Sequence, residues 1–282
     1  MKLQHFLLTR FNVRHKRFLG SALWKGGDPG YLERRFSLFE KYTLASVGKQ
    51  WTPFRWLVFY SSLTPEPFKT RAKAYAERCP QYEAVFVDDA VPLERPRSQE
   101  VYLSALLERL GAEVTHYIAS RIDNDDAFNV DALKAVRDAA ETELQNNGHD
   151  KFFVVMPHGA AYDENAGFTQ TYDWEWNHFP SIVCCRQNPD QPFSTQHTQI
   201  QGAGLPVVEV PLSNAWLEVV NGTNLVNSLR VHRCSPRFFS SALMSEVFGI
   251  DVEMSRWAFF RYWMSAYLPA KFMSLFGGKR QG

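Results

Sequence analysis

Three carboxylates, those of Asp123, Asp125 and Asp126, lie within four residues and follow the short apolar run 118–122. Asn124 lies between the first two. Such acids repel one another unless a positive group lies among them, and oxygen ligands suit a hard divalent cation. Carboxylates at i and i+2 on a turn can approach one cation from the same side, leaving its other positions for phosphate oxygens and water. The sequence therefore predicts a metal site, while an Asx-rich turn before a helix remains the alternative.

The elements that must position these carboxylates alternate between strands and helices. Apolar runs predict strands at 5–12, 55–60, 83–89, 115–122 and 151–156. Helical spacing predicts helices at 31–47, 69–78, 98–110 and about 131–144, with Ser98 capping the third and Asn129 or Asp131 the fourth. This order indicates an α/β fold, with a mostly parallel sheet and helices on both faces. The carboxylates then lie at the carboxyl edge of the sheet, where open α/β sheets bind ligands.

The alternation ends after Pro157. Period-two alternation at 168–176 predicts an antiparallel strand, with 181–186 as a candidate partner, and short strands are predicted at 206–211 and 215–220. The tail from 253 to 280 is helical in pattern, aromatic and basic. We expect a single domain, 1–282, whose parts are 1–156, an antiparallel addition at 157–250 and the tail at 251–282.

The composition narrows the class of protein. The chain has 282 residues, 45% of them hydrophobic, and 31 basic against 30 acidic residues leave a charge of +1, so no net field favours nucleic acid. The four cysteines fit neither a zinc nor a disulfide pattern, and no apolar run is long enough to span a membrane. We expect a cytoplasmic protein. Because G-x-G-x-x-G and P-loop motifs are absent, any bound phosphate must be held by metal and side chains.

Four segments of the sequence together resemble the bacterial rhamnosyltransferase family, over about residues 4–230. They are HFLLTRFN near the start, LFEKYTLASVGKQ followed by FRWLVFYSS, then YIASRIDNDDAF, and finally AWLEVVNGTN. The family looks like GT-A-fold, nucleotide-sugar-dependent glycosyltransferases. The resemblance implies that Asp123 and Asp125 bind Mn²⁺ or Mg²⁺, which grips the diphosphate of a sugar nucleotide, with Asn124 and Asp126 as close neighbours. It also makes 1–156 the nucleotide-sugar-binding half and 157–250 the acceptor-side half.

One position departs from the family pattern. The AWL-x-VV segment is usually followed by His-Gly, and here it is followed by Asn221 and Gly222. The resemblance places a third metal ligand in this region. Asn221 could supply it through its carbonyl oxygen, His197 or His232 could replace it, or the Asp pair could hold the metal alone.

The resemblance also implies donor-binding residues at the ends of the first, third and fourth strands. Thr9, Arg10 and Asn12 end the first strand, where the nucleotide is recognised, and Arg10 either binds a phosphate, stacks on the base or pairs with a nearby acid. Asp88 is expected either to contact the base or ribose or to cap the next loop. Arg121 either balances the charge of the acid cluster or reaches the diphosphate.

The acceptor side should provide the catalytic base, since a carboxylate that takes the proton of an acceptor hydroxyl makes it nucleophilic. Asp173 and Glu175 are preferred to Asp163, because the neighbouring Trp174 and Trp176 suit the faces of sugar rings. The alternative is a strand whose tryptophans pack inward and whose acids face solvent.

The expected activity is transfer of a sugar, with rhamnose implied by the resemblance, from a nucleotide-diphosphate donor to a glycan or lipid-linked acceptor. Two other hypotheses remain: a metal-dependent phosphohydrolase that uses the Asp cluster with His158 or His197, and a non-catalytic carbohydrate-binding protein. The aromatic and basic tail could contact the inner face of a membrane, or it could pack on the core or on a second subunit.

Overall fold

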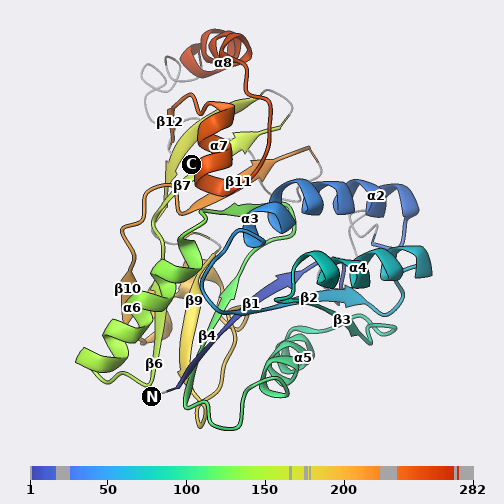
Figure 1. The fold of residues 1–282 in the computed structure, drawn as a ribbon, viewed down its shortest axis with the longest axis vertical. Coiled ribbons are helices and arrows are strands. Elements are labelled where there is room, and N and C mark those ends of the chain that lie inside the picture. The colour runs from blue at the N-terminus through green and yellow to red at the C-terminus, as the bar shows by residue number, and fades with distance from the viewer. Residues whose placement is uncertain are drawn as a thin grey trace, which may run out of the picture.

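The structure is a computed structural model that describes residues 2–16, 26–164, 167–174, 177, 179–222, 234–269 and 272. Its strands form a seven-stranded and a five-stranded sheet (Figure 1). The larger sheet has the spatial order β10 (Val207–Glu209), β6 (Lys151–Val155), β9 (Ser181–Cys185), β4 (His116–Arg121), β1 (Leu3–Arg10), β2 (Arg55–Ser61) and β3 (Tyr82–Val87).

The larger sheet is parallel apart from one strand. Strands β1 to β4 pair in parallel, as do β6 and β10, and only β9 runs antiparallel to its neighbours β4 and β6. The expected α/β fold class with a mostly parallel sheet is therefore confirmed. The prediction for 181–186 is wrong in its pairing, because β9 inserts between β4 and β6 instead of joining the strand at 168–173. The physical reason for this pairing is that β9 is buried along its whole length, and a position between two strands of the larger sheet, which is covered on both faces, provides that burial.

Helices cover both faces of the larger sheet. Leu7 faces a core formed with α2 (Pro29–Leu38), η1 (Phe39–Leu44), α3 (Ala45–Val47), α4 (Glu66–Arg78) and α6 (Ala132–Asn146). The adjacent Phe6 and Leu8 face the opposite core, formed with α5 (Arg95–Leu107). Figure 1 shows α2 and α4 on one side of β1–β3 and α5 on the other. Successive side chains of β1 face opposite cores because the side chains of a strand alternate between its two faces.

The ends of the helices follow local sequence signals. α2 begins with Pro29 at its first position, and the carboxylate of Asp28 accepts the backbone N–H of Tyr31 at 2.7 Å. Asp131 is the N-cap residue of α6, as expected. Ser98 is not the cap of α5, because the helix starts at Arg95 and the Ser98 hydroxyl donates to a carbonyl within the first turn.

The smaller sheet continues from the larger one and adds an antiparallel layer. Its spatial order is β12 (Cys234–Pro236), β8 (Phe168–Asp173), β7 (His158–Asp163), β11 (Trp216–Val220) and β5 (Ala127–Phe128). The strand predicted at 168–176 pairs antiparallel with β7 and β12, and only β7 and β11 pair in parallel. α7 (Ser241–Phe248) packs on this sheet through Met244 and Phe248.

Gly159, on β7, leaves room for the indole ring of Trp216, on β11. A Cβ atom at this position would lie 2.2 Å from the indole ring of Trp216, which is fully buried. We expect Gly159→Ala to lower the free energy of unfolding by about 1–3 kcal/mol through overpacking. Urea denaturation measures this change. Gly202→Ala is the control, because a Cβ there meets no atom within 4 Å, and an equal loss in both variants would contradict the prediction.

Candidate active site

The acid segment, residues 123–126, lies where the order of the strands reverses. β2 and β3 extend the larger sheet on one side of β1, and β4 lies on its other side. The carboxyl ends of β1 and β4 therefore border the crevice at which open α/β sheets bind their ligands. The acid segment leaves β4 at this edge and continues into β5, a strand of the smaller sheet.

The helix that follows β1 holds the acid segment in place through polar side chains. The hydroxyl of Thr43 donates to the backbone carbonyl of Asp126 at 2.8 Å, and the hydroxyl of Ser46 accepts the backbone N–H of Phe128 at 3.2 Å. The amide of Gln50 donates to the carbonyl of Asn129 at 2.7 Å. These buried bonds satisfy the backbone of the turn, so its carboxylates are fixed from the helix side.

Asp125 forms a buried ion pair. Its Oδ2 accepts Nη1 of Arg35 at 2.9 Å and Nδ2 of Asn221 at 2.8 Å. Burial lowers the pKa of Arg35, but the charge and hydrogen bond of Asp125 outweigh it, so the pKa lies above its ordinary value. Asn221 thus contacts the expected metal pair through its amide nitrogen, and the carbonyl oxygen expected as a ligand is not the atom directed at Asp125.

Asp126 is the most enclosed of the three acids. Its Oδ1 accepts the backbone N–H of Val219 at 2.8 Å, and its Oδ2 is buried without a hydrogen-bond partner. Burial, followed by the nearby charges of Asp125, Asp123 and Glu218, raises the pKa of Asp126 well above its ordinary value. This side chain joins the acid segment to β11 and faces away from solvent.

Asp123 and Asn124 differ in what their side chains can reach. The amide of Asn124 is buried and donates to the carbonyl of Phe11 at 2.9 Å, which ties the acid segment to the end of β1. The carboxylate of Asp123 is only half-buried, and it makes no hydrogen bond with the part of the chain that the structure describes. Asp123 is therefore the member of the segment best placed to bind a ligand from solvent.

Two arginines lie beside the acid segment on a shared aromatic ring. The guanidinium carbon of Arg10 is 4.4 Å from the centroid of Phe193, and that of Arg121 is 5.6 Å from it. Arg121 is buried and donates to the carbonyl of Pro192 at 3.2 Å. Burial lowers the pKa of Arg121 to about 10, with Asp123 raising it and Arg10 lowering it. The neighbouring cations of Arg10 and Arg121 would both be stabilised by an anion.

Other residues expected to bind the donor are bound within the protein. The hydroxyl of Thr9 is fully buried and accepts the indole N–H of Trp56 at 3.0 Å. The amide of Asn12 donates to the carbonyl of Gly26 at 2.8 Å and accepts the backbone N–H of Ser61 at 3.1 Å. These two side chains shape the ends of β1 and β2.

The acids at the end of β3 divide into an exposed and a buried one. Asp88 is exposed and accepts the backbone N–H of Ala90 at 3.3 Å. Asp89 is fully buried and accepts the hydroxyl of Ser61 and the backbone N–H of Arg14, each at 2.7 Å. Asp89 thereby connects β3 to β2 and to the segment after β1, while Asp88 stays accessible at the rim.

The candidate catalytic base Asp173 is exposed at the end of β8. Its Oδ1 lies 3.0 Å from Nδ1 of His158, at the start of β7. Trp174 follows it, and the ring of His197 lies edge-on at 5.1 Å from the ring of Trp174. Asp163 ends β7 and is half-buried. Glu175, Trp176 and His232 lie outside the described residues.

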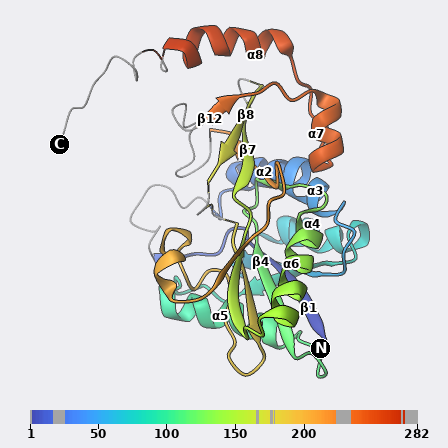
Figure 2. The same ribbon diagram turned by 90° about the vertical axis from the view of Figure 1, so that its left-hand side faces the viewer.

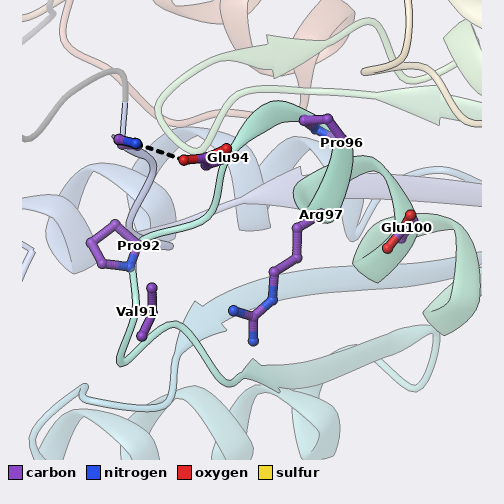
Figure 3. A pocket seen from close by; sticks show the side chains of 7 residues that line it. Val91, Pro92, Glu94, Pro96, Arg97 and Glu100 are labelled. Carbon is purple, nitrogen blue, oxygen red and sulfur yellow. Dashed lines mark hydrogen bonds and ion pairs between the residues drawn. The ribbon is translucent and has the colours of Figure 1, made fainter.

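A cavity of 590 Å³ lies beyond β3 and the start of α5. It is lined by Lys16, Val91, Pro92, Glu94, Pro96, Arg97 and Glu100. Figure 3 shows the side chain of Arg97 extending from α5 into this space. At its border, Nζ of Lys16 and Oε1 of Glu94 form an ion pair, 2.6 Å apart. The cavity contains none of the acids of the cluster, so it is separate from the predicted metal site.

The donor set suits a hard divalent cation held by two protein side chains. Within the described residues no group of three His, Cys, Asp or Glu side chains could hold a metal, so His158 and His197 do not join the acids in a larger cluster. Asp123 offers a half-buried carboxylate two residues from Asp125, whose buried Oδ2 is already bonded to Arg35 and Asn221, and both carboxylates are hard oxygen ligands. The guanidinium of Arg35 balances part of their charge. These residues fit Mn²⁺ or Mg²⁺ whose other ligands come from phosphate and water.

Arg35 is the site residue that the pattern of the sequence did not single out. It is buried next to Leu32 and Phe36 on a helix whose apolar spacing indicated only packing. The signal lay in the polar residues on the continuation of that apolar stripe, namely Thr43, Ser46 and Gln50. Buried polar side chains at such positions need partners, and here the partner is the acid segment.

A comparison with known protein families identifies the family to which this chain belongs. The sequence profile of the family described as "Putative rhamnosyl transferase" matches residues 8–233, a range that includes the end of β1, the helix of Arg35, the acid segment and Asn221. The chain belongs to this family. The acid segment, Arg35 and Asn221 therefore all lie in the part of the chain that the family profile matches. A search of curated proteins returns no match.

Solved structures similar to this chain have low sequence identity to it and TM-scores below 0.5. S. aureus TarS 1-349 has 13% identity and a TM-score of 0.41, with 78% of this chain and 60% of that chain covered. A protein from Desulfovibrio desulfuricans G20, described as a "putative nucleotide-diphospho-sugar transferase", has 11% identity and a TM-score of 0.35, with coverages of 78% and 82%. A TarS structure in complex with UDP has 13% identity and a TM-score of 0.40, with coverages of 78% and 61%. The chain spans about 60% of the TarS chain.

Proposed function

We propose that this protein transfers a sugar, rhamnose by family, from a nucleotide-diphosphate donor to a hydroxyl of a glycan or lipid-linked acceptor. The observation that carries the proposal is the position of the acid segment. In a chain of this family, its half-buried Asp123 lies at the reversal of the strand order, beside two arginines. Carboxylates for a metal next to guanidinium groups for phosphate are what a sugar-nucleotide diphosphate requires.

Asp123 and Asp125 would hold Mn²⁺ or Mg²⁺ at this edge. The cation, when bound, supplies a Lewis acid that stabilises the charge of the departing diphosphate. Arg35 orients Asp125 from the side of α2, and Asn221 orients the same carboxylate from the end of β11. Asn124 fixes the turn to β1, so the segment is held from three directions.

Arg10 and Arg121 would bind the donor phosphates. Arg121 is buried with a guanidinium that borders Arg10, and an anion between them relieves their repulsion. Asp88, exposed at the end of β3, would contact the base or ribose. Thr9 and Asn12 would support the donor site by holding the end of β1 in place, because their side chains are hydrogen-bonded within the protein.

The acceptor hydroxyl would lose its proton to a carboxylate on the side of the smaller sheet. Asp173 is the described candidate, and Glu175 is the second. The hydroxyl oxygen forms the new bond to the anomeric carbon as the bond to the diphosphate breaks, through an oxocarbenium-like state. His158, 3.0 Å from Asp173, can orient that carboxylate or share its proton. A cytoplasmic site of action accords with the free, buried thiols of Cys79, Cys184 and Cys185.

A thermal-shift screen with nucleoside diphosphates tests the proposed function. The melting temperature of the wild-type protein is expected to rise by about 5 °C with a matching diphosphate and MnCl₂, because binding to the folded state alone stabilises it. The diphosphate without metal should give a smaller shift, and the corresponding nucleoside should give none. The absence of a shift with any diphosphate in the presence of Mn²⁺ and Mg²⁺ would overturn the proposal.

A further inference from the structure

The C-terminal helical segment has an exposed aromatic stripe. It consists of α8 (Arg256–Tyr262) and η4 (Trp263–Tyr267), which follow one another without a break. Trp257 is 70% exposed and Phe260 47%, and the exposed Met264 and Leu268 continue the same spacing of three and four residues. Residues at this spacing lie on one face of a helix. Figure 2 shows α8 at one end of the molecule, beyond the smaller sheet.

The opposite face of this segment packs on the protein and fixes its orientation. The ring of Phe259 meets the ring of Phe238 edge-on at 5.6 Å, and Tyr267 is buried. The guanidinium of Arg256 lies over the same Phe238 ring at 5.5 Å. One apolar face is therefore already used in packing, so the stripe of Trp257, Phe260, Met264 and Leu268 is a second apolar face directed to solvent. Packing on the core does not account for it.

The charge of this region is of one sign. From residue 254 to the last residue the sequence has five basic residues and no acidic one, namely Arg256, Arg261, Lys271, Lys279 and Arg280. This excess is larger than the charge of +1 on the whole chain. Arg261 belongs to the helix that carries the stripe, so aromatic and cationic side chains are presented together. A surface of this composition complements an anionic, partly apolar partner.

We propose that α8 and η4 form a peripheral membrane-binding surface that lies on an anionic phospholipid bilayer. The stripe enters the boundary between headgroups and acyl chains, while the exposed Arg261 on the same helix pairs with the lipid phosphates. Among the described residues no helix is long and apolar enough to cross a membrane, so the contact is with one leaflet. A second copy of the chain suits the stripe less well, because a two-fold contact through the same patch would oppose identical positive charges.

Cosedimentation of the full chain with lipid vesicles tests this surface without any sugar donor, so its outcome is independent of the proposed transfer reaction. The wild-type protein is expected to pellet with vesicles of phosphatidylcholine and phosphatidylglycerol, and weakly with phosphatidylcholine alone. Added NaCl should reduce pelleting, because the lipid charge acts within a Debye length. The variant Trp257→Glu/Phe260→Glu should lower the partition coefficient by about tenfold or more.

A matched variant separates the stripe from general surface charge. Leu63→Glu/Val91→Glu adds the same two charges at exposed apolar positions elsewhere, and it should bind vesicles like the wild type. Equal loss in both variants, or no binding of the wild type to anionic vesicles at low salt, would overturn the proposal. So would a wild-type dimer in sedimentation velocity that Trp257→Glu/Phe260→Glu converts to a monomer, since the stripe would then be an interface between copies.

Discussion

Replacing Asp123 by Asn is expected to lower the kcat/KM for cleavage of the donor sugar by about a thousandfold. The carboxylate of Asp123 is half-buried and makes no hydrogen bond with the described residues, so its charge is available to a bound cation. An Asn of almost the same shape retains an oxygen but loses the charge that binds and orients the metal. Release of the nucleoside diphosphate from the donor identified by the thermal-shift screen measures the effect.

The stability of this variant distinguishes a binding role from a structural one. Because the carboxylate of Asp123 makes no hydrogen bond with the described residues, Asp123→Asn should change the free energy of unfolding by less than about 0.5 kcal/mol. Asp138→Asn is the control, since Asp138 is an exposed acid on α6, and its activity should equal that of the wild type. Wild-type activity of Asp123→Asn, with metal present, would rule out Asp123 as a metal ligand.

Replacing Arg35 by Met is expected to lower the free energy of unfolding by about 3–5 kcal/mol, because it leaves the buried carboxylate of Asp125 without its counter-charge. Arg35 and Asp125 are both almost fully buried, and Nη1 and Oδ2 are 2.9 Å apart. Met fills much of the volume of the Arg side chain, so the loss reports chiefly on charge. Urea denaturation monitored by circular dichroism measures it.

The adjacent arginine provides the control for this ion pair. Arg34 pairs with Glu164 near the surface, where Lys41 also contacts the same carboxylate, so Arg34→Met should cost only about 0–1 kcal/mol. The double variant Arg35→Met/Asp125→Leu removes both charges, and it should be more stable than Arg35→Met alone. Equal stability losses in the two single arginine variants would show that the buried pair has no special role.

The first half of the fold follows from the sequence because its strands form short apolar runs and the helices between them carry apolar residues at helical spacing. Local periodicity is then enough to order β1 to β4 and α2 to α6. The pairing of β9 is not local. Its apolar residues fit any buried position, and only the gap between β4 and β6 decides where the strand inserts.

The position of the acid segment at the end of β4 was predictable from the apolar run that precedes it, whereas its binding of a metal stays a prediction. Its supports were not predictable, since they come from residues that are distant along the chain. Arg35 is 90 residues from Asp125 and Asn221 is 96 residues away, and neither distance has a signature in spacing. The same limit applies to Thr9, whose hydroxyl has the chemistry of a ligand contact but is bonded to the indole of Trp56.

The acid segment is also one of the covalent connections between the two sheets, because β4 belongs to one and β5 to the other. Val219 and Asn221 bring the smaller sheet back to Asp126 and Asp125, so backbone and side chains cross this connection within a few residues. The smaller sheet cannot rotate relative to the larger one without disturbing the geometry of these carboxylates. A ligand that binds these carboxylates would therefore be sensitive to the relative orientation of the two sheets.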